Sequence, residues 1–301
     1  MKIFETLKNL EIENKTAVTI GVFDGIHLGH QELLKKVVEI SFAAKCKPAV
    51  ITFQTNPKLL FNNHNNLYSG QLISFQNKKK MLEKIGIEYL INFKSDEPIF
   101  EYSAESFISE ILIKTLKTEF IVIGYDFRFG KEKKGNNELL TKYFKENVIN
   151  VKKIVLNGKT VSSSNIKKCL INNNISFANQ MLGYKYGFSG IVKKGKRLGR
   201  TIGFPTINID YPENIIQLSG VYESSIIIRG KLYKSISHIG EIPTFNESKK
   251  VIETFVMDFN ETVYDEKVTV FPERFIRKII KFNSIDELKK QIIIDVNIIK
   301  N

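Results

Sequence analysis

The stretch Gly21-Val22-Phe23-Asp24-Gly25-Ile26-His27-Leu28-Gly29-His30 decides how the first half of this chain is interpreted. It follows an apolar β-type run over residues 17–20 and opens a run over 31–40 whose apolar positions recur with helical spacing. The sequence therefore predicts a strand, a glycine-punctuated loop and a helix. The first N–H groups of such a helix have no internal partner, and its dipole is positive there, so this loop is predicted to bind phosphate.

The two histidines of this stretch are three residues apart, which places them on one face at the start of the helix. A single histidine at a helix start is commonly a cap or a solvated side chain. Two of the four histidines of the chain, in HxGH spacing behind a strand, favour a phosphate clamp instead. This clamp uses neither a Walker lysine nor a GxGxxG pattern.

Length and composition indicate a two-domain globular protein. The chain has 301 residues, of which 43% are hydrophobic and 26% charged. The sequence contains no run of eighteen apolar residues, so we expect no membrane span, and the N-terminus does not resemble a signal peptide. Cys46 and Cys169 form no CxxC pair, so we expect a reducing, cytoplasmic location and neither a disulfide framework nor a cysteine zinc site.

The formal net charge is +13 and is spread over both halves of the chain. Such an excess is compatible with nucleic-acid binding, with anionic substrates, or with a lysine-rich codon bias, and we favour the last. The basic runs at 78–80 and 131–134 carry no interleaved stacking aromatics, so they are expected to be solvated faces. We therefore expect no nucleic-acid partner and no membrane partner.

Apolar β-type runs alternate with helical patterns through the first half, after a short polar lead-in over residues 1–15. This alternation predicts βαβ units and a parallel sheet, with ligands beyond the carboxyl ends of the strands. The segments at 21–30, 52–57 and 124–130 fall at such ends. An amphipathic helix is expected over 104–116. The predicted strands are 17–22, 48–53, 89–93, 120–124 and 148–156.

Two further segments of the first half carry polar groups suited to a ligand. Residues 124–130 read Gly-Tyr-Asp-Phe-Arg-Phe-Gly, where a carboxylate and an arginine between aromatic rings can contact a planar ring; a surface turn with core phenylalanines is the alternative. Residues 161–167 read Val-Ser-Ser-Ser-Asn-Ile-Lys, which predicts a helix N-terminus. Such a serine-rich start is either a simple cap or a second phosphate-facing helix.

The pattern changes after Gly183. Short β-type runs separated by turns predict a small antiparallel barrel or sandwich, closed by a helix with a capping box at Ser284 and Glu287. We therefore expect one domain over 1–183 and another over 184–301. The predicted strands of the second are 188–192, 221–228, 233–239, 251–259 and 268–271.

The second half has its own phosphate-binding pattern. Residues 190–208 contain glycines interleaved with lysines and arginines, which can cradle a polyphosphate; a basic hairpin is the alternative. In the extended segment after Pro205, Thr206 and Asn208 point to one side and offer hard oxygen ligands suited to Mg²⁺. Glu253 alternates with apolar residues on one face of a predicted strand, so it is either paired or catalytic.

Taken in order, these motifs resemble the bacterial bifunctional riboflavin kinase/FAD synthetase family. The stretch 21–30 is similar to the HxGH motif of nucleotidyltransferases, and 161–167 to the family motif Ser-Ser-Thr-x-Ile-Arg. The resemblance implies an α/β protein: an N-terminal Rossmann-like nucleotidyltransferase domain with a parallel sheet, and a C-terminal small antiparallel β-barrel, riboflavin kinase-like, with a terminal helix. The kinase-like segments are 199–208, 220–222, 239–245, 253–259 and 277–295.

The resemblance implies two successive reactions: phosphorylation of riboflavin to FMN by ATP, then adenylylation of FMN to FAD with release of pyrophosphate. The implied partners are the small molecules riboflavin, FMN and ATP, the implied cofactor is Mg²⁺, and a homo-oligomer is left open. The implied catalytic residues are Glu253, His27 and His30, and the implied metal ligands are Thr206 and Asn208. The implied ATP-binding residues are Gly21, Phe23, Asp24, His27, His30, Ser163, Ser164, Lys167, Gly195, Gly199, Arg200 and Thr206. The implied flavin-binding residues are Asn56, Asp126, Phe127, Arg128, Asn208, Glu253 and Arg277.

The chain departs from the family pattern at several positions. Asn56 stands where the family usually has the histidine of Pro-His-Pro, and Lys167 replaces an arginine. His238 and Ile242 replace a customary asparagine and arginine. The change at 56 motivates an alternative, a riboflavin kinase with a degenerate adenylyltransferase domain. A third hypothesis, based on the charge, is a non-enzymatic binder of nucleic acid or flavin.

Overall fold

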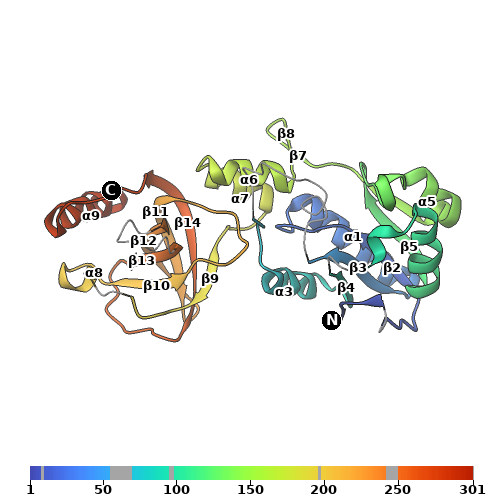
Figure 1. Ribbon diagram of the computed structural model, residues 1–301, viewed down its shortest axis with the longest axis horizontal. Helices are drawn as coiled ribbons and strands as arrows, with labels where there is room; N and C mark the ends of the chain where they lie inside the picture. The colour runs from blue at the N-terminus through green and yellow to red at the C-terminus, as the bar shows by residue number, and fades with distance from the viewer. Residues whose placement is uncertain (8–9, 55–69, 95–97, 196–197, 242–249, 301) are drawn as a thin grey trace. The chain divides into compact units, whose positions relative to one another are not determined.

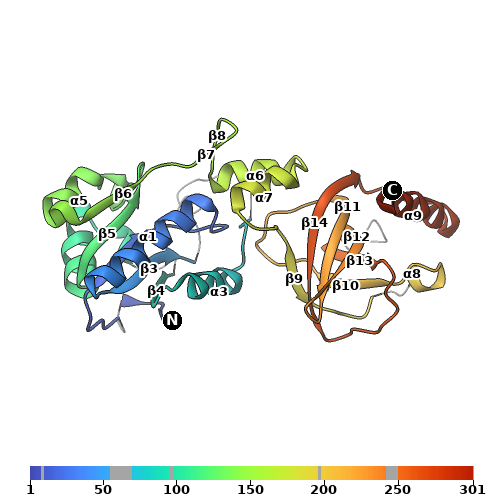
Figure 2. The same ribbon diagram turned by 180° about the vertical axis from the view of Figure 1, so that it is seen from behind.

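The computed structural model describes residues 1–7, 10–54, 70–94, 98–195, 198–241 and 250–300. These residues form two compact units, each described by itself below (Figures 1 and 2). Unit 1 holds the described residues up to Ser163 except 70–72, and unit 2 holds 70–72 and those from Ser164 onward. Residues 164–183, placed in the first domain from sequence, cluster with unit 2; the functional boundary at 183 remains a prediction.

Unit 1 is built on the expected parallel sheet. The strand order is β1-β4-β3-β2-β5-β6, and each neighbouring pair runs parallel. The chain leaves the central strand β2 toward β3 and later returns to its other side at β5, so the order reverses between β2 and β5. Ligands in open α/β sheets bind at such a switch point, beyond the carboxyl ends of the strands. The strands are β1 Lys2–Phe4, β2 Thr16–Ile20, β3 Lys47–Phe53, β4 Tyr89–Phe93, β5 Thr118–Gly124 and β6 Val148–Val151.

The strands of unit 1 differ from the predicted ones at two segments. The polar lead-in contains β1, which pairs with β4 and extends the sheet. The run predicted as one strand over 148–156 ends its sheet pairing at Val151, and its last two residues, β7 Val155–Leu156, form a small hairpin with β8 Lys159–Thr160. Short edge elements of two or three residues carry too little periodicity to be recognised.

Both faces of the parallel sheet are covered, which explains why all five residues of β2 and of β4 are buried. Helices α1 and α3 pack on one face, and η3 and α5 pack on the other. The expected helix over 104–116 is present as a short α-helical start followed by a π-helical segment. The helices are α1 Leu28–Ala44, α3 Phe75–Ile85, η2 Pro98–Glu101, α4 Ala104–Ser106, η3 Phe107–Thr115, η4 Lys131–Lys133, α5 Asn137–Phe144 and η5 Lys145–Asn147.

Unit 2 is a nearly closed antiparallel barrel. Its strand order is β10-β13-β12-β11-β14-β9, and a bridge between Lys193 and Asn208 brings the segment after β9 back to β10. Helices α6 Ser163–Ile171, α7 Ile175–Leu182 and α8 Leu198–Thr201 precede or interrupt the strands. The strands are β9 Phe188–Ile191, β10 Thr206–Asp210, β11 Gly220–Ile228, β12 Lys231–Glu241, β13 Lys250–Val256 and β14 Lys267–Arg277.

The closing helix α9 Ile285–Lys300 packs on the barrel. Val296 and Ile299 of α9 form one buried cluster with Val221 of β11 and Ile236 of β12. The expected cap is present: the Ser284 Oγ accepts a hydrogen bond from the backbone N–H of Glu287 at 3.2 Å. No helix within the described part of the chain is long and apolar enough to cross a membrane.

Candidate active sites

The loop between β2 and α1 is bent by three residues in the left-handed region. Phe23, Gly25 and Ile26 have φ values of 51°, 84° and 34°. Only glycine adopts this region freely, so the two non-glycine residues store strain that the surroundings must hold. Both of their side chains are fully buried, which fixes them. Backbone strain of this kind concentrates at functional sites, and this loop lies at the switch point of the sheet.

The two histidines of the loop are held against one another. His27 is the N-cap of α1, and its Nδ1 accepts a hydrogen bond from the backbone N–H of His30 at 3.4 Å. The two rings stack with centroids 3.6 Å apart. Because the Nδ1 of His27 is an acceptor, the proton of the neutral ring is on Nε2, which makes that N–H a donor for a phosphate oxygen.

Burial keeps both imidazoles neutral. Desolvation lowers the pKa of His27 to about 4. It also lowers the pKa of His30 well below its ordinary value, and electrostatic interactions with His27 and Lys78 disfavour the protonated form of His30 further. Both rings are therefore uncharged near pH 7 and act as N–H donors and not as cations. The Nδ1 of His30 is buried without a hydrogen-bond partner among the described residues.

A lysine that the sequence assigned to a solvated face lies beneath this loop. Lys78 of α3 is only 3% exposed, and its Nζ donates to the backbone carbonyl of Val22 at 2.8 Å. Burial lowers the pKa of Lys78 to about 8, and Asp24 opposes that shift. The expectation for residues 78–80 was thus wrong for Lys78, because a lysine-rich run does not reveal which lysine turns inward; Lys80 is exposed.

Of the other residues predicted for this site, the structure brings Ser163 to the loop. Its Oγ donates to the backbone carbonyl of Asp24 at 2.8 Å, and Asp24 itself is buried. Ser164 and Lys167 belong to unit 2, so their role toward the histidines stays a prediction. Asn56 lies outside the described residues.

The segment 124–130 follows β5, the strand beside β2, so it reaches the same edge of the sheet as the histidine loop. Asp126 and Arg128 are exposed there. Phe127 packs on the core and stacks on Phe129, with centroids 5.6 Å apart. The carboxylate and guanidinium are accessible, whereas Phe127 is largely engaged in packing. Tyr125, 56% exposed, is the aromatic ring that this turn presents to solvent.

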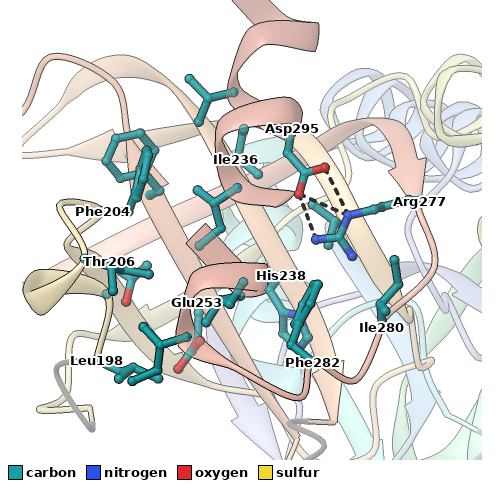
Figure 3. Close-up of a pocket in the computed structure, with 18 of the residues that line it drawn as sticks. Leu198, Phe204, Thr206, Ile236, His238, Glu253, Arg277, Ile280, Phe282 and Asp295 are labelled. Carbon is teal, nitrogen blue, oxygen red and sulfur yellow. Dashed lines mark hydrogen bonds and ion pairs between the residues drawn. The ribbon is translucent and has the colours of Figure 1, made fainter. Parts of the chain in front are cut away.

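The barrel carries a second site, formed by a row of residues across five strands. Strand register places Asn208 opposite Glu253, Glu253 opposite His238, His238 opposite Val221, and Val221 opposite Arg277. All five line one cavity of about 450 Å³, and Figure 3 shows His238, Glu253 and Arg277 in its wall. The sequence predicted three of these positions, and the register brings them into one line.

Most of the cavity wall is apolar, and nearly all of it comes from the segments 190–208, 220–222, 253–259 and 277–295 that the sequence had marked. Phe204 and Phe255 meet edge to face with centroids 5.2 Å apart, and α9 closes one side. A cavity of this size, apolar with a few convergent polar groups, suits a planar organic ligand. The motifs marked these segments, but the sequence did not show which of their apolar side chains turn toward one cavity. Its apolar lining residues are Leu198, Ile202, Phe204, Val221, Ile236, Phe255, Ile280, Phe282, Ile285, Leu288, Ile292 and Val296.

Arg277, predicted to bind flavin, forms an ion pair with Asp295 of α9. The Nε of Arg277 lies 3.0 Å from both carboxylate oxygens of Asp295, and its Nη2 lies 2.7 Å from Oδ2 (Figure 3). The Nε2 of Gln291 adds a third donor to this carboxylate at 2.9 Å. Arg277 therefore connects the barrel to α9 at the rim of the cavity, and its contact with flavin stays a prediction.

His238, one of the departures from the family pattern, is held in a fixed tautomer. Its Nε2 lies 3.1 Å from the backbone carbonyl of Glu241 and therefore carries the proton. Burial and the nearby charge of Arg277 lower the pKa of His238, so the ring is neutral near pH 7. The ring thus stands between Glu253 and Val221 as an uncharged polar group.

Thr206 and Asn208 point to one side of β10, as expected from its alternation. The Asn208 Nδ2 donates to the Thr206 carbonyl at 3.2 Å and to its Oγ1 at 3.4 Å. This orients the Asn208 Oδ1 away from those acceptors and leaves two hard oxygen donors on one face, a set that fits Mg²⁺. Gly195 allows the close approach: an added Cβ would lie 2.7 Å from the Asn208 Nδ2. Gly199 lines the same cavity.

A second hollow of about 250 Å³ is lined in part by β10. Arg200 lines it, and Thr206 lines both the hollow and the cavity, so the two spaces share that residue. The sequence identified Arg200, Thr206 and the segment 253–259, which supplies Val256 and Phe259, but not the loop that follows this segment. The residues from that loop are Asn260, Glu261, Thr262, Val263 and Tyr264.

Comparisons with known proteins agree with this two-site arrangement. The FAD synthetase family model matches residues 9–165, and the riboflavin kinase family model matches 182–301. The bifunctional riboflavin kinase/FMN adenylyltransferase of Buchnera aphidicola subsp. Schizaphis graminum is 37% identical, covering 100% of this chain and 98% of its own. The protein of that name from Escherichia coli K12 is 31% identical, covering 97% and 95%.

Among solved structures, a crystal structure described as a macrolide-efflux protein from Streptococcus pneumoniae superposes with a TM-score of 0.87. It is 28% identical and covers 100% of this chain and 98% of its own. Sequence matches over the full length, with both family models in the expected order, are decisive. The chain belongs to the bifunctional riboflavin kinase/FMN adenylyltransferase family.

Proposed function

We propose that this chain makes FAD in two steps, each at its own site. Unit 2 transfers the γ-phosphoryl group of ATP to riboflavin, and unit 1 transfers the adenylyl group of a second ATP to FMN. The observation that carries the proposal is the row Asn208–Glu253–His238, which places a carboxylate beside a Mg²⁺-type ligand at the wall of a mostly apolar cavity. The functional modules are taken as 1–183 and 184–301.

In the kinase step, the riboflavin 5′-hydroxyl attacks the γ-phosphorus of ATP and ADP leaves. Glu253 accepts the hydroxyl proton as general base, a role that suits a carboxylate at the cavity wall. Thr206 and Asn208 would hold the Mg²⁺ that accompanies ATP, and this ion would offset charge on the phosphates. Catalysis then consists mainly of holding the hydroxyl and the phosphorus in line.

Each of the two spaces is suited to one substrate of this step. The larger, apolar cavity is suited to the flavin ring, which is planar and mostly apolar. The smaller hollow, lined by Arg200, is suited to the nucleotide. Thr206 lines both spaces, so it is suited to hold the γ-phosphate that passes from one substrate to the other.

In the adenylyl step, an FMN phosphate oxygen attacks the α-phosphorus of ATP and pyrophosphate leaves. The nucleophile is already an anion, so this step needs positioning and charge stabilisation more than a base. The helix N-terminus and the Nε2–H of His27 act as donors to the triphosphate. Asp126 and Arg128 contact FMN from the neighbouring strand end.

A kinase-only protein is the alternative based on Asn56. Relatives that match the whole chain carry both activities in their names, which favours two active sites. The test is to incubate the protein with riboflavin, ATP and Mg²⁺ and to separate the flavins by chromatography. We expect both FMN and FAD to form. Formation of FMN alone would support the alternative, and the absence of both products would overturn the proposal. His27→Ala should remove FAD only, and Glu253→Ala should remove both products from riboflavin but not FAD from added FMN.

A further inference from the structure

Lys78 is a buried cation in the adenylyl-transfer unit that the mechanism above does not use. It lies on α3, away from every motif of the sequence, and its ammonium group donates to the Val22 carbonyl at 2.8 Å. Val22 belongs to the strained loop that carries the two histidines. A buried ammonium opposes folding because desolvation disfavours its charged form, so packing alone does not explain a lysine here.

Holding the loop does not by itself require a charge. The Thr52 hydroxyl of β3 also donates to the Val22 carbonyl, at 3.1 Å. This neutral bond remains when Lys78 is replaced by an apolar residue. What Lys78 adds is a positive charge behind the loop, inside a poorly hydrated region where charges interact strongly.

The charged and titratable groups near this ammonium come from the loop and from α1. Asp24 of the loop interacts favourably with it. Interactions with His27 and Lys78 lower the pKa of His30 of α1 and so disfavour its protonated form. From β3 the neighbour is the uncharged Thr52. Lys78 thus adds to the desolvation that keeps His30 neutral, and it supplies a positive charge that a bound triphosphate can balance.

We propose that Lys78 is a positioning residue for adenylyl transfer, whose buried ammonium fixes the Val22 carbonyl and provides the fixed positive charge beneath the triphosphate. The inference rests on the proposed function of unit 1. It adds a residue that acts through the loop and not by contact with the reacting atoms. Its low pKa, about 8, predicts that the charge is lost within an accessible pH range.

The test compares Lys78→Met, Lys78→Arg and Thr52→Val, with Lys80→Met as the matched control, an exposed lysine on the same helix. FAD formation from FMN reports unit 1, and FMN formation from riboflavin reports unit 2 in the same molecule. We expect Lys78→Met to lower kcat/KM for ATP in adenylyl transfer about tenfold or more at pH 7. Its kinase activity and its thermal midpoint should not fall, and the control should match wild type.

The pH profile distinguishes an electrostatic role of Lys78 from a purely structural one. In wild type, kcat/KM for ATP in adenylyl transfer should fall as pH rises through about 8, because Lys78 loses its proton. Lys78→Arg should retain activity and lose that limb, since arginine stays charged. Equal losses in Lys78→Met and Thr52→Val with an unchanged profile would overturn the inference, as would full activity of Lys78→Met. Absence of FAD formation in wild type would instead refute the function of unit 1.

Discussion

The ion pair between Arg277 and Asp295 should determine how firmly α9 is held on the kinase cavity. The Arg277 side chain is 17% exposed and that of Asp295 is 3% exposed, so the pair is shielded from water. Arg277→Met would leave the carboxylate buried with Gln291 as a neutral donor. Removing one partner of a buried pair costs about 3–5 kcal/mol, because the remaining charge is uncompensated.

This free-energy cost predicts a change in the hydrogen-exchange rate of α9. If the ion pair stabilises the docked helix by this amount, losing it shifts the equilibrium between docked and undocked α9 by about 10²- to 10³-fold or more. Hydrogen–deuterium exchange of peptides covering residues 285–300 should accelerate by that factor in Arg277→Met. Pairing this change with Asp295→Leu should restore part of the protection, because the buried charge is then gone.

Arg274 provides a matched control on the same strand. Its Nε lies 2.8 Å from Glu223 and its Nη2 lies 3.4 Å from the Ile298 carbonyl of α9, but its side chain is 59% exposed. Exposed pairs contribute about 0–1 kcal/mol, so Arg274→Met should change exchange by less than about fivefold. Equal protection of α9 in Arg277→Met and in wild type would refute the reasoning, and so would a double variant no better protected than the single one.

Three other outcomes follow from the two sites. Glu253→Gln should lower riboflavin phosphorylation by about 10²–10⁴-fold and leave FAD formation from added FMN unchanged, as measured by product chromatography; an unchanged kinase rate would exclude Glu253 as the base. Gly195→Ala places a Cβ 2.7 Å from the Asn208 Nδ2, so the KM for ATP of the kinase should rise while that of adenylyl transfer does not. Because the neutral form of His27 is required and its pKa is about 4, kcat/KM of adenylyl transfer should stay level on the acid side down to about pH 5.5; a fall centred near pH 6.5 would contradict this.

The sequence predicted the parts of the fold that follow from local, periodic residue patterns. The alternation of strands and helices gave the parallel sheet, and Thr206 and Glu253 were placed on their correct faces, because a strand alternates its side chains strictly. The position of the histidines at a helix start followed from the glycine-rich loop. These features depend on neighbours within a few residues.

What the sequence did not predict depends on distant contacts. Lys78 looks like its neighbours in a lysine run, and only the packing of α3 against the loop turns it inward. The partner of Arg277 is eighteen residues away on another element, so its role as an anchor of α9 was not visible. The second hollow needs a loop after β13 that carries no recognisable pattern.

The central claim is that one chain carries out both phosphoryl and adenylyl transfer. The most direct measurement is a single incubation with riboflavin, Mg²⁺ and ATP labelled distinguishably at the α- and γ-phosphorus, followed by isolation of the flavins. If both transfers occur, FMN carries only the γ-label, and FAD carries one γ-derived and one α-derived phosphorus. FMN labelled in this way without any doubly labelled FAD would contradict this claim.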